Sequence, residues 1–217
     1  MVATKDVKST LIGHLRELHL PTFRECFEQY AGRALQETLS YEQYLLELTQ
    51  RECEVRRANR IERWLRQSKL PLEKNLESFD MKRLPAKVAR QVRSLLDGSF
   101  VDRTENLLAF GKSGSGKTHL LAAIAQELVR SGRKVYFSTC SLLVQELLIA
   151  KRDLKLSRVL KRLSGFDALM IDDIGYVQQS REEMEVLFTL LAERYERGSV
   201  MLTSNLPFSK WEGIFKD

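Results

Sequence analysis

The sequence predicts an α/β protein in which a parallel sheet carries helices on both faces and a small all-helical domain precedes it. Residues 1–66 show no strand-like segment, and their apolar residues recur at helical spacing. Four short apolar runs follow, and helical sequence separates each run from the next. Strands that alternate with helices form parallel sheets, and such strands are apolar throughout because both faces are buried.

The front segment is expected to contain three helices. Their apolar positions begin at Leu11, resume after Pro21 and resume again at Tyr41. The third helix is long, and its apolar stripe consists of Leu45, Leu48, Val55, Ile61 and Leu65. Six arginines and three glutamates mix on the opposite face between residues 51 and 66, a pattern typical of a solvated face.

Helical periodicity is lost between residues 67 and 80, which places a helical domain at 1–68, a linker at 69–80 and an α/β core at 81–217. The core is expected to begin with a helix after Pro85 that Gly98 ends. The expected strands are 107–110, 135–137, 168–171 and 200–202. The expected helices between them are 117–130, 141–162 with a break near Asp153, and 181–197.

Composition narrows the class of protein. The 217-residue chain is 43% hydrophobic and 29% charged, which is ordinary for a globular protein. No apolar run approaches the ~18 residues that a membrane span needs, and the N-terminus does not look like a signal peptide, so we expect a cytoplasmic protein. The cysteines and histidines are scattered, which predicts neither disulfides nor a metal site built from them. The net charge of +6 is compatible with a polyanionic partner.

A glycine-rich loop between the first expected strand and the next helix carries the clearest chemical signal. The phosphate-binding pattern is matched by Gly111, Lys112, Ser113, Gly114, Ser115, Gly116, Lys117 and Thr118. Glycines let backbone N–H groups turn toward phosphate oxygens, and the helix N-terminus adds partial positive charge. Lys117 is expected to span the β and γ phosphates, and Thr118 to offer its hydroxyl to Mg²⁺. His119, the next residue, is added to the expected nucleotide-binding set.

Polar residues end two other expected strands at the same edge of the sheet. Asp172 and Asp173 follow the third apolar run, where Asp172 would face Mg²⁺ and Asp173 would hold the attacking water. Asn205 follows Thr203 and Ser204 after the fourth run and would bond the γ phosphate or that water; each polar tip is, in isolation, also ordinary turn chemistry. The sequence lacks a guanine-reading Asn/Thr-Lys-x-Asp tetrad after the second strand, which favours ATP over GTP.

The residues in and around these motifs resemble one family. The segments GKSGSGKTHL, ALMIDDIG and VMLTSNLPFSKWEGIF follow a front segment that contains LHLPTFRECFEQY. Over nearly the whole chain they resemble the IstB-like ATP-binding proteins of insertion sequences, relatives of the DnaC helicase loader and the DnaA initiator. The resemblance implies an AAA+ P-loop NTPase with strand order 5-1-4-3-2. It implies Walker A roles for Lys117 and Thr118, Walker B roles for Asp172 and Asp173, and a first-sensor role for Asn205.

The resemblance also implies a function, that of an ATP-dependent transposition helper. Such proteins bind DNA with little sequence preference, assemble on it as ATP-bound homo-oligomers, and recruit or stimulate a transposase. Lys117, Asp173 and Asn205 would form the catalytic set. Asp173 stands where most AAA+ enzymes have Glu, which implies slow hydrolysis. The fifth strand, the arginine finger and the helical lid with the second sensor are expected beyond residue 217.

The helix pair at 141–162 is expected to contact DNA, because it corresponds to the insert that related initiators and loaders use to line DNA. The contacting residues would be Lys151, Arg152, Lys155, Arg158, Lys161 and Arg162. Their helical offsets place most of them on one face, while the leucines and valine at 154, 156, 159, 160 and 163 pack inward. A merely solvated face is the alternative, and the arginines at 51–66 form the next candidate surface.

Other functions stay open on the sequence. A DnaC-type replicative helicase loader would share the nucleotide site and differ in its front domain, where residues 1–66 show no cysteine cluster or aromatic stacking pattern that decides between them. A small-molecule kinase is disfavoured, because a leucine-rich basic helix pair stands where its substrate lid would lie. A non-catalytic interaction protein is disfavoured because Lys117, Thr118, Asp172 and Asp173 are all present.

Overall fold

A computed structural model describes residues 4–175, 180–207, 209 and 211 of the chain. Its backbone divides into two compact units, Met1–Glu62 and Arg63–Asp217, and the division falls inside the third helix. Each unit is described by itself below. Within the described residues, no helix combines the length and the apolar character needed to cross a membrane.

The first unit consists of helices, as expected. They are α1 (Thr4–Glu17), α2 (Pro21–Glu37) and the first part of α3 (Tyr41–Ser68), and these three helices confirm the predicted number. Pro21 occupies the first turn of α2, where its missing N–H costs nothing. Of the expected stripe on α3, Leu48 is buried whereas Leu45 is 54% exposed, so the stripe is narrower than predicted.

One residue of the supposedly solvated face of α3 is buried. Glu52 is 4% exposed, and its carboxylate accepts hydrogen bonds from the backbone N–H of Thr22 at 3.0 Å and of Phe23 at 3.3 Å. Arg56 donates to the same carboxylate at 2.6 Å. Helix N-termini leave N–H groups without intrahelical partners, so Glu52 caps α2 from another helix. The expectation of a purely solvated face is wrong at this position.

The second unit contains a parallel sheet of four strands within the described residues. These strands are β1 (Leu107–Phe110), β2 (Val135–Thr139), β3 (Ala168–Ile174) and β4 (Ser199–Ser204), in the order β1-β4-β3-β2. The predicted order 5-1-4-3-2 included a fifth strand, which the described residues do not contain. Three strands extend beyond the predicted apolar runs, because their polar ends remain paired in the sheet.

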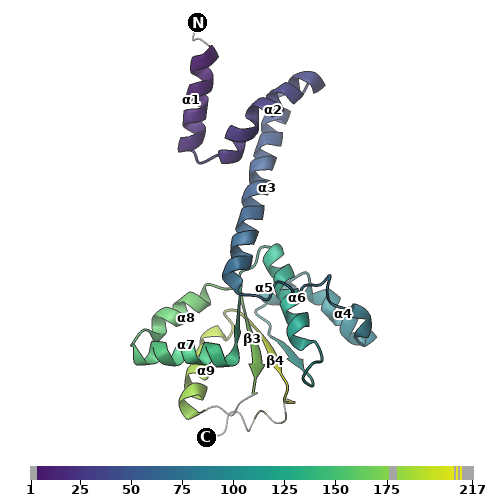
Figure 1. Ribbon diagram of the computed structural model, residues 1–217, viewed down its shortest axis with the longest axis vertical. Coiled ribbons are helices and arrows are strands. Elements are labelled where there is room, and N and C mark those ends of the chain that lie inside the picture. The colour runs from purple at the N-terminus through teal and green to yellow at the C-terminus, as the bar shows by residue number, and fades with distance from the viewer. Residues whose placement is uncertain (1–3, 176–179, 208, 210, 212–217) are drawn as a thin grey trace. The chain divides into compact units, whose positions relative to one another are not determined.

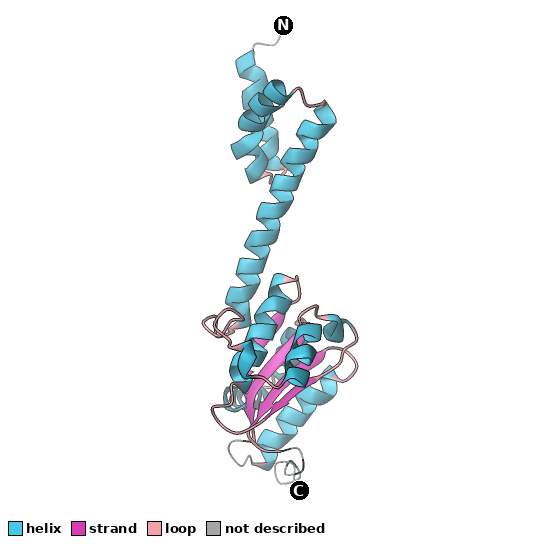
Figure 2. Ribbon diagram, turned by 90° about the vertical axis from the view of Figure 1, so that its right-hand side faces the viewer, coloured by secondary structure: helices cyan, strands magenta, loops and turns pink. Residues whose placement is uncertain are grey.

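Helices cover both faces of this sheet (Figures 1 and 2). The helices are α4 (Ala86–Leu95), α5 (Ser99–Asp102), α6 (Lys117–Arg130), α7 (Cys140–Arg152), α8 (Leu156–Ser164) and α9 (Arg181–Arg194), with a 3-10 turn at Met81–Arg83. The break near Asp153 is confirmed. Helix α5 was not predicted, and the last helix ends at Arg194 instead of residue 197.

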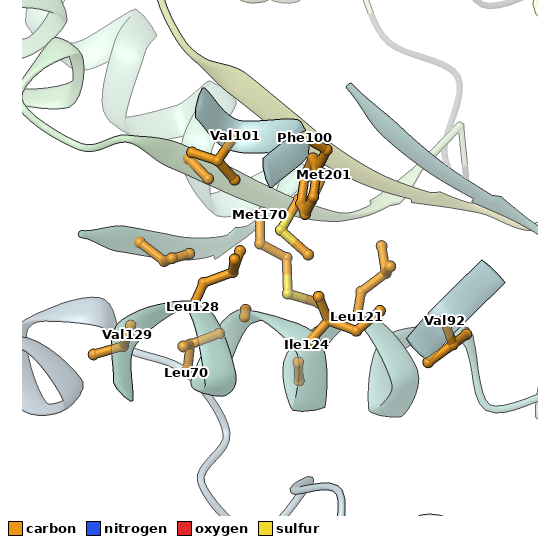
Figure 3. Close-up of a cluster of buried hydrophobic side chains, with 14 residues drawn as sticks. Leu70, Val92, Phe100, Val101, Leu121, Ile124, Leu128, Val129, Met170 and Met201 are labelled. Atoms are coloured by element: carbon orange, nitrogen blue, oxygen red, sulfur yellow. The ribbon is translucent and has the colours of Figure 1, made fainter. Parts of the chain in front are cut away.

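Alternate residues of the buried strands face two separate cores. Met170 of β3 and Met201 of β4 pack with α4, α5 and α6, as Figure 3 shows for Leu121, Ile124 and Leu128. The neighbouring residues Leu169 and Ile171 pack on the opposite face with α7, α8 and α9. This period of two explains why the strand sequences are apolar at consecutive positions.

The segment expected to serve as a linker packs on α6. Leu70 is 6% exposed and belongs to the same core as Met170. Gln126, at the centre of α6 and 2% exposed, donates from its side-chain amide to the carbonyls of Pro71 at 3.1 Å and Lys74 at 3.0 Å. The backbone of residues 71–74 is therefore held against α6, within the second unit, by a buried polar side chain.

Candidate phosphate-binding site

The predicted phosphate loop lies between β1 and α6, at the carboxyl edge of the sheet. Gly114 and Gly116 have positive φ angles of 74° and 86°, which favour glycine, and Gly116 is the N-cap of α6. A Cβ atom on Gly111 would lie 2.9 Å from Ser115 Oγ, so a larger residue at this position would force the Ser115 side chain to shift. The loop therefore has the conformation that its glycines predict.

Lys117, the first residue of α6, joins the loop to the end of β4. Its Nζ donates to the carbonyl of Lys112 at 3.0 Å and to Asn205 Oδ1 at 2.7 Å. Strands β1 and β4 are neighbours in the sheet, which brings these residues together although 88 positions separate Lys117 from Asn205. Two of the predicted catalytic residues are in direct contact.

Thr118 joins α6 to the end of β3. Its hydroxyl donates to Asp172 Oδ1 at 2.9 Å, and Asp172 is only 6% exposed. The two predicted metal ligands thus present a hydroxyl oxygen and a carboxylate oxygen side by side. Oxygen ligands of this kind suit Mg²⁺.

Thr203 lies at the polar tip of the fourth expected strand, but the sequence did not predict the role of its hydroxyl group. Its hydroxyl donates to Asp172 Oδ1 at 2.5 Å and accepts from the backbone N–H of Asp173 at 2.8 Å. Thr203 is fully buried. A hydroxyl inside a buried parallel strand needs hydrogen-bond partners. A threonine within an apolar strand sequence is therefore the signal that could have predicted a polar partner at the end of the strand.

The backbone departs from regular strand geometry at Asp173. The β3–β4 register shifts between Ile171 and Ile174, and Asp173 has a φ of 60°. Ser204 Oγ stabilises the far side of this irregularity by donating to the carbonyl of Ile174 at 2.8 Å. Strained backbone of this type, fixed by buried hydroxyls, is common at functional sites.

Asp173 has an altered acidity. The surrounding protein partly desolvates the Asp173 carboxylate, and this desolvation together with the neighbouring Asp172 carboxylate raises the pKa of Asp173, while the ammonium groups of Lys117 and Lys74 oppose that rise. The net direction is upward, so Asp173 is a stronger base than an ordinary aspartate.

A pocket of about 290 Å³ unites most of these residues. Its lining comprises Lys74, Ser113, Gly114, Gly116, Lys117, Thr118, His119, Asp173 and Asn205. Lys112, predicted in this set, contributes its carbonyl to Lys117 instead of lining the pocket. Lys74 was not predicted, because it belongs to the segment expected to be a linker.

His119 both lines the pocket and holds that segment. Its Nε2 lies 3.1 Å from Ser78 Oγ and 3.1 Å from the carbonyl oxygen of Asn75. The ring of Phe79 packs edge-on against the imidazole, with 5.1 Å between ring centroids.

A second pocket of about 380 Å³ adjoins the first and was missed by sequence reasoning. The two pockets share Gly116 and Lys117, and Gly111 and Ser115 line the second one. The remaining lining is largely apolar and comes from α4, β1 and α6, including Val88, Val92 and Leu107. Ordinary core residues form it, so no local motif marks it.

The predicted basic surface on α7 and α8 is partly neutralised. Lys151 pairs with Glu185 at 2.9 Å, Lys155 with Asp153 at 3.3 Å, and Arg162 with Glu146 at 2.5 Å. The predicted inward packing is wrong for Leu154, which is 93% exposed because it lies at the turn between the helices. Within the described part of the chain, no ion pair is found for Arg152, Arg158 or Lys161.

Arg194 is a buried structural residue instead of an exposed helix end. It is 3% exposed, and its guanidinium donates to the carbonyls of Phe166 at 2.6 Å, Asp167 at 2.9 Å and Ser199 at 3.0 Å. These acceptors lie at the N-terminal ends of β3 and β4, and Arg194 does not line the phosphate pocket at the opposite edge of the sheet.

Comparison with known proteins identifies relatives over most of the chain. The model of the IstB-like ATP binding protein family matches residues 13–217. A putative insertion sequence ATP-binding protein of Sinorhizobium fredii is 39% identical, over 94% of this chain and 68% of that protein. The IS21 putative ATP-binding protein of Pseudomonas aeruginosa is 36% identical, over 95% of this chain and 77% of that protein.

Solved structures share the AAA+ fold. AMPPCP-bound DnaA from Aquifex aeolicus aligns with a TM-score of 0.58 and 20% identity, over 68% of this chain and 47% of that chain. The DnaC helicase loader aligns with a TM-score of 0.55 and 21% identity, over 64% of this chain and 82% of that chain. The match to DnaA therefore spans less than half of that protein. By its sequence, the chain belongs to the IstB-like ATP-binding protein family.

Proposed function

We propose that this protein is an ATP-dependent transposition helper, which hydrolyses ATP with Mg²⁺ and assembles with its own copies and a transposase on DNA. The observation that best supports the ATP chemistry is the convergence of Lys117 with Asn205 and of Thr118 with Asp172. Three elements far apart in the sequence meet there, with a cation, an amide and a carboxylate at one pocket.

The two adjoining pockets fit the two halves of ATP. The phosphate chain lies in the 290 Å³ pocket, against the N-terminus of α6 and the ammonium of Lys117. The base lies in the apolar 380 Å³ pocket, since ligand sites bury flat apolar groups among apolar side chains. The shared lining residues Gly116 and Lys117 set the junction between the two halves.

Thr118 and Asp172 would hold Mg²⁺, which supplies neutralisation of the charge on the transferred phosphoryl group. Thr203 supports this role, because its hydroxyl fixes the Asp172 carboxylate that Thr118 also contacts. Asp172 is thereby oriented in advance, which spares reorganisation when nucleotide binds.

Asp173 would hold and deprotonate the attacking water. The irregular backbone at the end of β3 places this residue in the pocket lining together with Lys117 and Asn205. Its raised pKa strengthens it as a base. Its side chain is shorter by one carbon than the usual glutamate, so hydrolysis is slow.

The nucleotide site is tested by equilibrium titration with a fluorescent ATP analogue in the presence of Mg²⁺. Lys117→Ala should abolish binding, whereas Lys82→Ala, an exposed lysine outside both pockets, should bind like the wild type. Asp173→Asn should bind ATP and lose hydrolysis. Binding by Lys117→Ala at wild-type affinity would remove the phosphate loop from the site.

DNA binding is proposed through Arg152, Arg158 and Lys161, the predicted basic residues that remain without an acidic partner in the described part of the chain. A DnaA structure among the fold neighbours is described as bound to AMPPCP and single-stranded DNA. Contacts of this kind go to phosphates, so binding should depend on salt and ignore sequence.

A salt titration by fluorescence anisotropy tests this surface. Replacing Arg152, Arg158 and Lys161 by Ala should flatten the slope of log K against log salt by roughly two to three, because each phosphate contact contributes about 0.9. The matched control replaces Lys82, Lys87 and Arg93, which are exposed on the 3-10 turn and α4. An unchanged slope in the first triple variant would turn attention to the arginines of α3.

A helicase loader is the second candidate, because DnaC and DnaI are among the fold neighbours, with TM-scores of 0.55 and 0.54. The two functions differ in the partner that the protein holds. Co-purification of the wild-type chain in ATP with its transposase, but not with the replicative helicase, is expected, and the reverse result would favour the loader.

A further inference from the structure

The segment 71–79 forms one wall of the phosphate pocket. Lys74 is half-buried and lines this pocket together with Lys117, Asp173 and Asn205. It lies outside the phosphate-loop motif and more than thirty positions before it. The site therefore contains a second lysine that no nucleotide-binding motif includes.

Two side chains of α6, those of Gln126 and His119, hold the segment 71–79 in place. Buried Gln126 binds the carbonyls of Pro71 and Lys74, and the backbone N–H of Lys74 donates to the carbonyl of Pro71 at 3.0 Å. His119, one turn into the helix, contacts Asn75 and Ser78. Lys74 is thus carried on a backbone that is anchored on both sides of it.

The pocket lining places Lys74 near the outer end of the phosphate chain. Lys74 lines the same pocket as Lys117 and as Asp173, the proposed holder of the attacking water. In the proposed mode of binding, that water attacks the γ phosphate, so a cation close to Asp173 lies beside the last phosphate. A packed linker alone explains Gln126 and Leu70, but it does not explain a lysine in the lining of this pocket.

We propose that Lys74 binds the terminal phosphate of ATP and makes the site prefer ATP over ADP. The proposal rests on the proposed ATP-binding function and adds a discriminating residue to it. ATP carries roughly one more negative charge than ADP, because its additional phosphoryl group adds one strongly acidic oxygen. An ammonium held beside that phosphate contributes a charge-assisted hydrogen bond that ADP lacks.

The test compares ATP and ADP affinities of Lys74→Gln, measured with Mg²⁺ by isothermal titration calorimetry on the full chain. A non-hydrolysable ATP analogue replaces ATP so that turnover does not distort the titration. We expect the affinity for the ATP analogue to fall about tenfold and the ADP affinity to change less than twofold. Lys74→Arg should retain most of the preference, and Lys82→Gln, which removes the same charge outside the pocket, should change neither affinity.

A second variant tests the anchoring. Gln126→Met keeps the side-chain length but removes the amide that binds Pro71 and Lys74, so the ATP preference should fall while Lys74 is still present. Equal losses for ATP and ADP in Lys74→Gln, or no loss, would overturn the role of Lys74. Failure of the wild type to bind either nucleotide would overturn the proposed function itself, so the two failures are distinguishable.

Discussion

Lys117 Nζ donates a 2.7 Å hydrogen bond to Asn205 Oδ1, and this contact links the first residue of α6 to the residue that follows β4. The lysine is thus held between the loop and the edge of the sheet. Its second acceptor is the carbonyl of Lys112 in the loop. Phosphate binding exchanges these neutral acceptors for charged ones, which makes stronger hydrogen bonds.

Asn205→Ala should separate binding from hydrolysis. Lys117 keeps its contact with Lys112, so ATP affinity should change by less than about threefold, whereas hydrolysis should fall about 10²-fold, as when one polar transition-state contact is removed. Nucleotide titration and phosphate release measure the two effects. Asn59→Ala, on the exposed surface of α3, is the control. A parallel loss of affinity would show that Asn205 acts mainly by holding Lys117.

Thr203→Val should disrupt the positions of Asp172 and Asp173, although Thr203 itself is not expected to contact the nucleotide. The substitution removes the donor to Asp172 and leaves the backbone N–H of Asp173 without its acceptor, at a cost of about 1–3 kcal/mol in unfolding free energy. Hydrolysis should fall as Asp172 and Asp173 lose their positions. Thr203→Ser keeps the hydroxyl and should restore activity.

The measurements for Thr203 are urea unfolding and ATP turnover. Thr189→Val is the matched control, because Thr189 is only half-buried on α9 and its hydroxyl donates within the helix, to the carbonyl of Glu185. A Thr203→Val protein with wild-type turnover would mean that the hydroxyl does not position Asp172.

The fold and the phosphate loop could be predicted because their signals are local. Apolar runs locate strands, and Gly114 and Gly116 report backbone conformations that only glycine adopts easily. Strand ends were predicted too short where polar residues continue the pairing, as at Thr139 and Thr203. Hydrophobicity alone stops at the first polar residue, although hydrogen bonds extend further.

Contacts between distant polar residues were not predictable in the same way. In the sequence, Glu52 is one member of a face of mixed charges. The packing of α2 against α3 brings its carboxylate to two backbone N–H groups, which donate hydrogen bonds to it. The sequence around Lys74 predicts a linker, whereas in the structure Gln126 anchors the backbone of Lys74. Such partners depend on the three-dimensional approach of elements, which periodicity does not report.

Arg194→Met should destabilise the second unit strongly. The guanidinium is buried, and the removal of its hydrogen bonds leaves the carbonyls at the ends of α8, β3 and β4 without these donors. Breaking a buried polar network costs about 3–5 kcal/mol. Arg197→Met should change stability by less than about 0.5 kcal/mol, because Arg197 is 75% exposed and pairs with the exposed Glu193.

Thermal unfolding followed by tryptophan fluorescence measures the effect of the two arginine variants. Nucleotide affinity, measured below the unfolding temperature, should be unchanged in Arg194→Met, since Arg194 lies outside the phosphate pocket. A stable Arg194→Met protein that had lost hydrolysis would instead make this arginine part of the catalytic machinery.

Glu52 makes the stability of the first unit depend on pH. Burial acts to raise the pKa of Glu52, but hydrogen bonds from Arg56, Thr22 and Phe23 outweigh it and hold that pKa below its usual value. A depressed carboxylate pKa stabilises the folded state above the unfolded pKa of about 4.3, and this stabilisation is lost as the pH falls through the folded value. Glu52→Gln should therefore cost about 2–3 kcal/mol at pH 7 and progressively less below pH 4.

Hydrogen exchange of peptides from residues 7–62, corrected for intrinsic exchange rates, measures this cost in stability at each pH. Glu54→Gln is the control, because Glu54 is exposed and pairs with the exposed Arg51 at 3.4 Å, and it should cost less than about 0.5 kcal/mol. A cost for Glu52→Gln that stays constant from pH 7 to pH 3 would show that the lost stability comes from packing and not from the carboxylate charge.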